Sequence, residues 1–66
     1  MNVFVNGVAR EVPAATTVAA LLSDLAVTQR HVAVEVNLEL VPRTRHAQHQ
    51  LQEGDRLEVV TLVGGG

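Results

Sequence analysis

The chain has 66 residues, enough for one domain with a thin core, because a chain of this length buries only about 60% of the surface that its unfolded form exposes. Seven acidic and five basic side chains give a formal charge of −2, and Phe4 is the one aromatic residue, so the basic stripe and stacking rings of a nucleic-acid-binding domain are missing. The lack of cysteine excludes disulfides, thiolate zinc sites and cysteine nucleophiles.

The first twelve residues predict an antiparallel hairpin. From Met1 to Val5, apolar residues stand at every second position, which is the period of a half-buried strand. Asn6-Gly7 follows, and this pair favours a type I′ turn, in which both central residues need positive φ. The alternation resumes from Val8 to Val12, and Pro13 ends this second strand.

The next segment changes period and predicts one helix near residues 17–26. Its apolar residues fall at i, i+3, i+4 and i+7 and form one face: Val18, Leu21, Leu22 and Leu25. Thr17 or Thr16 stands directly before that face and can accept a hydrogen bond from a free main-chain N–H as the N-cap. A helix of about ten residues is not stable alone, so we expect it to pack on a sheet.

The middle of the chain returns to the strand period. Alternate apolar residues give a third strand one buried face: Val32, Val34 and Val36. A short strand is predicted at Leu40-Val41, and Pro42 ends it. Residues 43–50 contain few apolar side chains and hold at most one irregular helical turn.

A last strand is predicted near residues 56–62, after a turn at Glu53-Gly54-Asp55. In this strand Leu57 and Val59 are expected to face the core. The order is then strand, strand, helix, strand, short strand, strand. This order predicts a single α+β domain over residues 1–66, with one main helix packed across a mixed sheet of four to five strands.

The element order and the glycines at the end resemble the β-grasp, ubiquitin-like fold. Within that fold the chain resembles the ThiS family of sulfur carrier proteins, in the MoaD/ThiS superfamily. The resemblance covers the whole chain and rests on the stretches MNVFVNG, TTVAALLSDL, VAVEVN, LVPR and LQEGDRLEVV and on the final Gly65-Gly66. The chain departs from the family pattern at Leu38, where a glycine or small polar residue is common, and at Gly64, which makes the end a triple glycine.

The resemblance implies that Gly66 is the reacting residue. In such carriers the C-terminal carboxylate is adenylated, becomes a thiocarboxylate, and donates sulfur for thiazole formation in thiamine biosynthesis. Residues 63–66 are expected to be a flexible tail, in which Gly64 and Gly65 thread into partner active sites, because glycine has no side chain to block a narrow channel.

The resemblance also implies a set of partners. They are a ThiF-like adenylyltransferase that uses ATP and Mg²⁺, a persulfide protein as sulfur donor, and a ThiG-like thiazole synthase. A carboxylate is an anion at neutral pH and a poor electrophile, so the carrier needs a partner to activate it. The chain is then a protein co-substrate and not an enzyme, with no catalytic residue, metal or bound cofactor of its own.

A partner-docking surface is predicted on the sheet face that the helix leaves uncovered. Phe4 is out of phase with the core residues Val3 and Val5, and in the last strand Val60 and Leu62 are out of phase with the core pair. Apolar residues exposed together indicate an interface. Phe4, Val60 and Leu62 are therefore the predicted docking residues.

The remaining polar residues predict no metal site. His46 and His49 could share one face of a turn, but no cysteine or carboxylate cluster completes a set of ligands with them or with His31. All three histidines are therefore interpreted as solvated surface residues. Arg43 could contact an acidic partner or form a structural ion pair, and the acidic residues of the 53–55 turn are assigned no acid–base role.

Other functions remain open from the sequence. A MoaD-like carrier for molybdopterin, or a carrier for cysteine synthesis, would share the fold and the tail. A ubiquitin-like protein modifier would form isopeptide bonds through Gly66, and a plain interaction module would leave the tail idle. No stretch approaches the roughly 18 apolar residues of a membrane span, and no basic region precedes an apolar leader, so we expect a cytoplasmic protein with no membrane partner.

Overall fold

The computed structural model describes residues 1–27 and 31–61. In chain order they form β1 (Asn2–Val5), β2 (Val8–Glu11), α1 (Val18–Asp24), β3 (Val32–Val36), β4 (Glu39–Val41), the short 3₁₀ helix η2 (Arg43–Arg45) and β5 (Arg56–Thr61). The predicted order of strands and helix is confirmed, and the irregular turn expected within residues 43–50 is η2.

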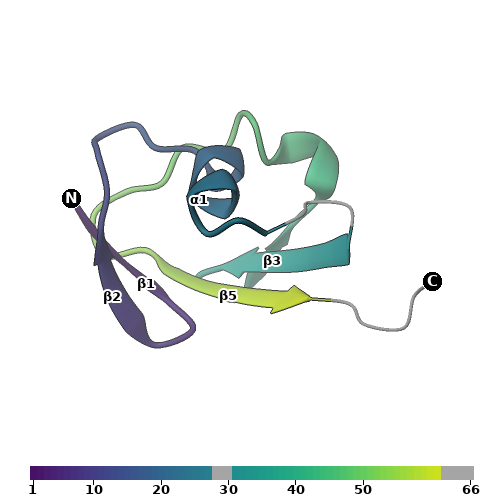
Figure 1. Ribbon diagram of the computed structural model, residues 1–66, viewed down its shortest axis with the longest axis horizontal. Helices are drawn as coiled ribbons and strands as arrows, with labels where there is room; N and C mark the ends of the chain where they lie inside the picture. Colours follow the sequence, from purple (N-terminus) through teal and green to yellow (C-terminus); the bar gives the residue numbers. More distant parts are fainter. Residues whose placement is uncertain (28–30, 62–66) are drawn as a thin grey trace.

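The five strands form one mixed sheet in the order β2-β1-β5-β3-β4. The central strand β5 runs parallel to β1 and antiparallel to β3, and the two outer pairs are antiparallel. Helix α1 lies across one face of this sheet (Figure 1). The predicted α+β architecture is therefore confirmed, with β5 between the N-terminal hairpin and the β3–β4 pair.

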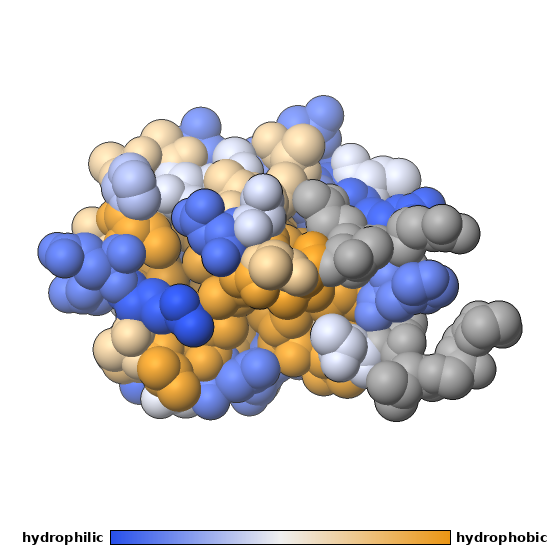
Figure 2. Space-filling view, viewed as in Figure 1, coloured by the Kyte–Doolittle hydropathy of each residue, from blue (hydrophilic) through white to orange (hydrophobic). Residues whose placement is uncertain are grey.

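The core fills the space between α1 and the sheet. Of the residues that the structure describes, twelve apolar ones are buried in it: Val3, Val5, Val12, Val18, Leu21, Leu22, Val32, Val34, Val36, Val41, Leu51 and Leu57. Four more pack against it but are only partly buried: Met1, Leu25, Val27 and Val59. Figure 2 shows apolar side chains gathered over the region between α1 and β5, so this thin core reaches the surface on that side.

Helix α1 begins as predicted and ends earlier than predicted. Thr17 is the N-cap, and its hydroxyl accepts a main-chain N–H at 3.1 Å. The helix ends at Asp24 because Ala26 adopts a φ of 57° and the Val27 N–H bonds to the Leu22 carbonyl at 3.0 Å, which closes the last turn. Within the described ranges, no helix has the length and apolar character to cross a membrane.

Two tight turns share the same left-handed backbone. Asn6 and Gly7 have φ of 51° and 83°, as the predicted type I′ turn requires. Asn37 and Leu38 join β3 to β4 with φ of 52° and 69°. Leu38 thus holds a conformation that costs a residue with a Cβ roughly 1–2 kcal/mol, although its side chain is 87% exposed and packs against little.

Candidate functional site

The candidate site is the end of β5, which is the last described part of the chain. Thr61 is the last residue of β5 and lies opposite Val32 of β3. Main-chain pairing with β1 stops earlier, at the pair Val5–Leu57. The end of β5 therefore extends past β1 while it stays paired with β3. Four residues predicted for the site lie outside the described residues: the reacting residue Gly66, the threading residues Gly64 and Gly65, and the docking residue Leu62.

Two asparagine side chains hold β5, one at each end. Near its end, Asn6 Oδ1 accepts a hydrogen bond from the Val59 N–H at 2.8 Å, and Asn6 Nδ2 donates to the Val59 carbonyl at 3.1 Å. At its start, Asn37 Oδ1 accepts from the Arg56 N–H at 3.0 Å, and Asn37 Nδ2 donates to Asp55 Oδ1 at 3.0 Å. Both asparagines belong to the left-handed turns, so residues of these turns also hold the main chain of β5.

The sheet face away from α1 carries the two predicted docking residues that the structure describes, Phe4 and Val60. Phe4 lies between the buried Val3 and Val5 and is half-buried, and the guanidinium carbon of Arg56 lies 4.7 Å from the centre of its ring. Val60 is 55% exposed. The alternation of apolar residues along β1 and β5 therefore predicted which face of the sheet is exposed.

Phe4 and Val60 do not form one continuous cluster. Phe4 pairs with Arg56, four residues before Val60, which places the two apolar side chains about 13 Å apart along β5. Glu58 stands between them on the same face, directly opposite Glu35 of β3. Leu40, which the sequence analysis did not select, is 65% exposed and pairs with Glu35. The face is thus a set of apolar side chains separated by charged ones.

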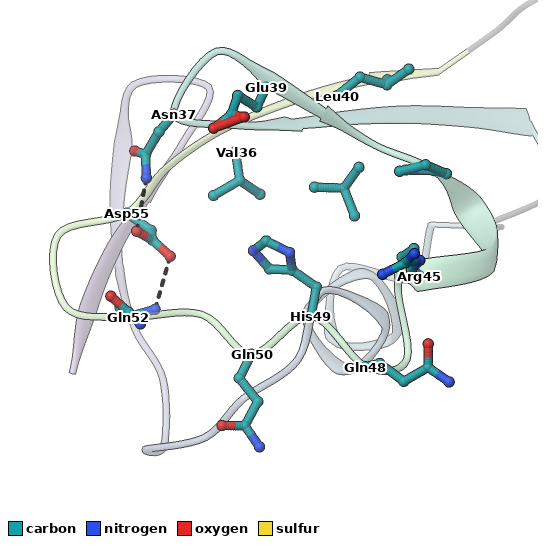
Figure 3. Close-up of a pocket in the computed structure, with 12 residues that line it drawn as sticks. Val36, Asn37, Glu39, Leu40, Arg45, Gln48, His49, Gln50, Gln52 and Asp55 are labelled. Carbon is teal, nitrogen blue, oxygen red and sulfur yellow. Dashed lines mark hydrogen bonds between the residues drawn. The ribbon is translucent and has the colours of Figure 1, made fainter.

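A hollow of about 630 Å³ lies at the opposite end of β5 from Thr61. Polar side chains dominate its lining, and the His49 ring points into it (Figure 3). The Asp55 carboxylate on its wall accepts hydrogen bonds from Asn37 Nδ2 and from the Gln52 N–H, the latter at 2.8 Å, so this acid has a structural task. Among residues 1–27 and 31–61, no group of three or more histidines and carboxylates is placed to hold a metal ion.

The interpretation of His46 as a surface residue was wrong. Its side chain is 1% exposed and its Nε2 lies 3.0 Å from the Val41 carbonyl, to which it donates as the tautomer protonated at Nε2. Its own carbonyl accepts from the Ala19 N–H at 3.0 Å, so His46 joins β4 to α1. No group within residues 1–27 and 31–61 forms a hydrogen bond with the His46 Nδ1 atom. By contrast, His31 is exposed and His49 is partly buried.

The acidic residues of the 53–55 turn stabilise the fold. Glu53 Oε1 accepts from the Asn2 N–H at 3.1 Å and so ties the turn before β5 to the first strand. Arg43 is exposed at the start of η2. None of these residues lies on β5 near Thr61.

The chain matches known proteins over its full length. The sequence model of the ThiS family matches residues 3–66. The sulfur carrier protein ThiS of Escherichia coli is 35% identical over 66 residues, which is the whole of both chains. The crystal structure of the thiamine biosynthesis protein ThiS from Geobacter metallireducens superposes with a TM-score of 0.81 at 38% identity and covers 100% of both chains. The five-stranded mixed sheet with one helix is therefore the predicted β-grasp fold.

Two longer proteins also match. A thiazole synthase of Paramagnetospirillum magneticum is 48% identical over the 66 residues, and one of Magnetococcus marinus is 39% identical. The chain spans only 20% of the length of each.

Proposed function

The chain belongs to the ThiS family, and from this membership we propose that it is the sulfur carrier for thiazole formation in thiamine biosynthesis. The observation that carries the proposal is the match to a sulfur carrier protein along the entire length of both chains. The family match also extends through Gly66, so it includes the glycine end as well as the folded body. Residues 63–66 would act as the tail that enters partner active sites.

We propose that sulfur is carried on the carboxyl carbon of Gly66. A carboxylate oxygen attacks the α-phosphorus of ATP and displaces pyrophosphate, which gives an acyl-adenylate on the partner enzyme. A persulfide sulfur then attacks the carbonyl carbon and displaces AMP. The product is an acyl disulfide between the chain and the donor. A thiol must reduce its S–S bond, and this releases the thiocarboxylate. The chain supplies an accessible end, and the partner supplies Mg²⁺ and the groups that hold phosphate.

The thiazole destination has support from the relatives. Two proteins described as thiazole synthases contain a segment similar to this chain, which favours a ThiG-like synthase as the acceptor of the sulfur over the enzymes of molybdopterin or cysteine synthesis. A ThiF-like adenylyltransferase and a persulfide protein complete the proposed set of partners. In this scheme the chain is a co-substrate, which each partner binds in turn.

Docking would use the sheet face that carries Phe4 and Val60. That face lies beside the end of β5, so a partner that covers it would receive the tail at the same time. The charged residues between the apolar ones would then meet polar groups of the partner. Hydrophobic contacts separated by charges suit a complex that must form and dissociate in each cycle.

The test is the intact mass of the 66-residue chain after incubation with ATP, Mg²⁺, a ThiF-like enzyme and a persulfide donor. We expect a gain equal to the exchange of one oxygen for one sulfur atom. Deletion of Gly66 leaves the carboxylate about 3.5 Å short of the reactive position. Because a misplacement of about 1 Å can cost a hundredfold in rate, that variant should be nearly inert.

Two further variants complete the test. Gly65→Phe should block passage of the tail and also prevent the mass gain, although the circular dichroism spectrum and the melting temperature remain those of the parent chain. Sulfur uptake by a chain that lacks both Gly65 and Gly66 would refute the proposal.

A further inference from the structure

The Asn6 side chain takes the place of a missing strand beside the end of β5. Main-chain pairing between β1 and β5 ends at Leu57, whose carbonyl accepts from the Asn6 N–H at 2.9 Å. Two residues further on, the Asn6 amide group bonds both the N–H and the carbonyl of Val59, at 2.8 and 3.1 Å. A planar amide that donates and accepts at once supplies the carbonyl and the N–H that two residues of a continued parallel strand would offer to Val59.

The backbone of Asn6 makes this arrangement possible. Its φ of 51° turns the chain away from β5 into the hairpin, while its side chain continues in the direction that β1 has left. Asparagine tolerates the left-handed conformation better than other residues with a Cβ, so it can supply both the turn and the amide. On the other side β5 pairs with β3 as far as the pair Val32–Thr61. Val59 is therefore held from both sides, two residues before the end of the strand.

We propose that Asn6 is a positioning residue for the reaction at Gly66. By holding Val59, it fixes the direction in which the chain leaves the sheet, so that the activating enzyme need not order the end of β5 when it docks. This inference rests on the proposed carrier function and names a residue that acts on it from within the fold. Asn6 touches no reacting atom, and its effect passes through Val59.

The expected effect is on binding of the carrier and not on the chemical step. If the end of β5 frays, docking must order it, and each residue ordered costs roughly 5- to 30-fold in affinity. Once the tail is bound, its reacting end is the same in both proteins. We therefore expect Asn6→Gly to raise the KM of the adenylating enzyme for the chain about 5- to 30-fold, with kcat within about twofold of the parent value.

Asn37 provides a matched control. It has the same residue type, a φ of 52°, and a side chain that also bonds the main chain of β5, but at Arg56, the start of the strand. Asn37→Gly should lower the melting temperature about as much as Asn6→Gly, because each change removes two hydrogen bonds and adds a glycine to a left-handed turn. If the two asparagines only stabilised the fold, the two glycine variants would have the same KM when both are fully folded.

The experiment combines steady-state adenylation kinetics with amide hydrogen exchange. In Asn6→Gly, the Val59 amide should exchange roughly 2- to 12-fold faster, the range expected for loss of one hydrogen bond, whereas in Asn37→Gly it should not change. Asn6→Asp keeps the acceptor for the Val59 N–H but not the donor, so its KM should fall between the parent and Asn6→Gly.

Each outcome has one meaning. A higher KM for Asn6→Gly together with an unchanged KM for Asn37→Gly supports the inference. Equal KM values for the parent and Asn6→Gly, or an equal rise in both glycine variants, overturn it. If the parent chain is not adenylated at all, the proposed function fails, and the exchange rate of the Val59 amide still decides whether Asn6 holds the end of β5.

Discussion

Replacement of Val60 by aspartate should weaken docking without unfolding the chain. Val60 is 55% exposed on β5, on the sheet face away from α1, and its neighbour across the strand pair is Ala33. Val8 offers a close match, since it is 59% exposed but lies on the edge strand β2. The two substitutions change the same side chain at nearly the same exposure, so they differ mainly in position.

The size of the effect can be worked out from the exposure of Val60. Full burial of a valine side chain contributes about 1.5–3 kcal/mol, and with 55% still exposed a partner can gain about half of that. A carboxylate at the same point must also lose water without a partner, which costs about 1–3 kcal/mol more. The sum is about 2–4.5 kcal/mol, or a loss of affinity of about 30- to 2000-fold.

The assay is a calorimetric titration of each variant against the ThiF-like enzyme, with thermal unfolding as the check on folding. Val60→Asp should lose affinity and Val8→Asp should stay within about threefold of the parent chain, since surface changes away from an interface alter little. Phe4→Asp and Leu62→Asp should follow Val60→Asp. Equal affinity for Val60→Asp and Val8→Asp would refute the docking face, and unchanged affinity in all three docking variants would remove it altogether.

Three further predictions concern stability and can be measured by thermal and urea unfolding. His46→Ala should lower the free energy of unfolding by about 2–4 kcal/mol, because it opens a cavity and leaves a buried carbonyl without its donor. His49→Ala should lower it by less than about 1 kcal/mol, and similar losses in the two variants would contradict a structural role for His46. Leu38→Gly should stabilise the chain by about 0.5–1 kcal/mol and raise the melting temperature by roughly 2–8 °C. The reason is that glycine removes the strain of the left-handed backbone, and this gain exceeds the entropy that glycine adds to the unfolded chain. A lower melting temperature would show that the leucine is not strained. Thr17→Ala should cost about 1 kcal/mol through the lost N-cap, and the exposed Thr44 provides the control, at which alanine should have little effect.

Local sequence patterns predicted most of the fold. The hairpin at Asn6-Gly7, the N-cap at Thr17 and the buried faces of α1 and β3 each depend on neighbouring residues, so they could be read from periodicity and turn chemistry. The end of α1 could not, because Ala26 closes the helix in a conformation for which the usual signal is glycine.

The parts that sequence reasoning missed depend on contacts between distant segments. His46 is polar and lies in a polar stretch, and only its contacts with Val41 and Ala19 explain its burial. The distance between Phe4 and Val60 depends on the register in which β1 pairs with β5. The hydrogen bonds between the Asn6 side chain and the Val59 main chain join residues 53 positions apart in the sequence. Periodicity along one strand shows which of its residues share a face, but not which residues of another strand lie opposite them.

We propose that Gly66 carries the sulfur that enters the thiazole. The most direct test loads the chain with isotopically labelled sulfur, isolates it, and presents it to a ThiG-like thiazole synthase with its other substrates for one turnover. We expect the label on the C-terminal peptide that contains Gly66 before the reaction, and in the thiazole afterwards, with the peptide returned to its carboxylate mass. A label located elsewhere in the chain, or a thiazole formed without label while the chain keeps its sulfur, would show that Gly66 is not the sulfur-carrying residue.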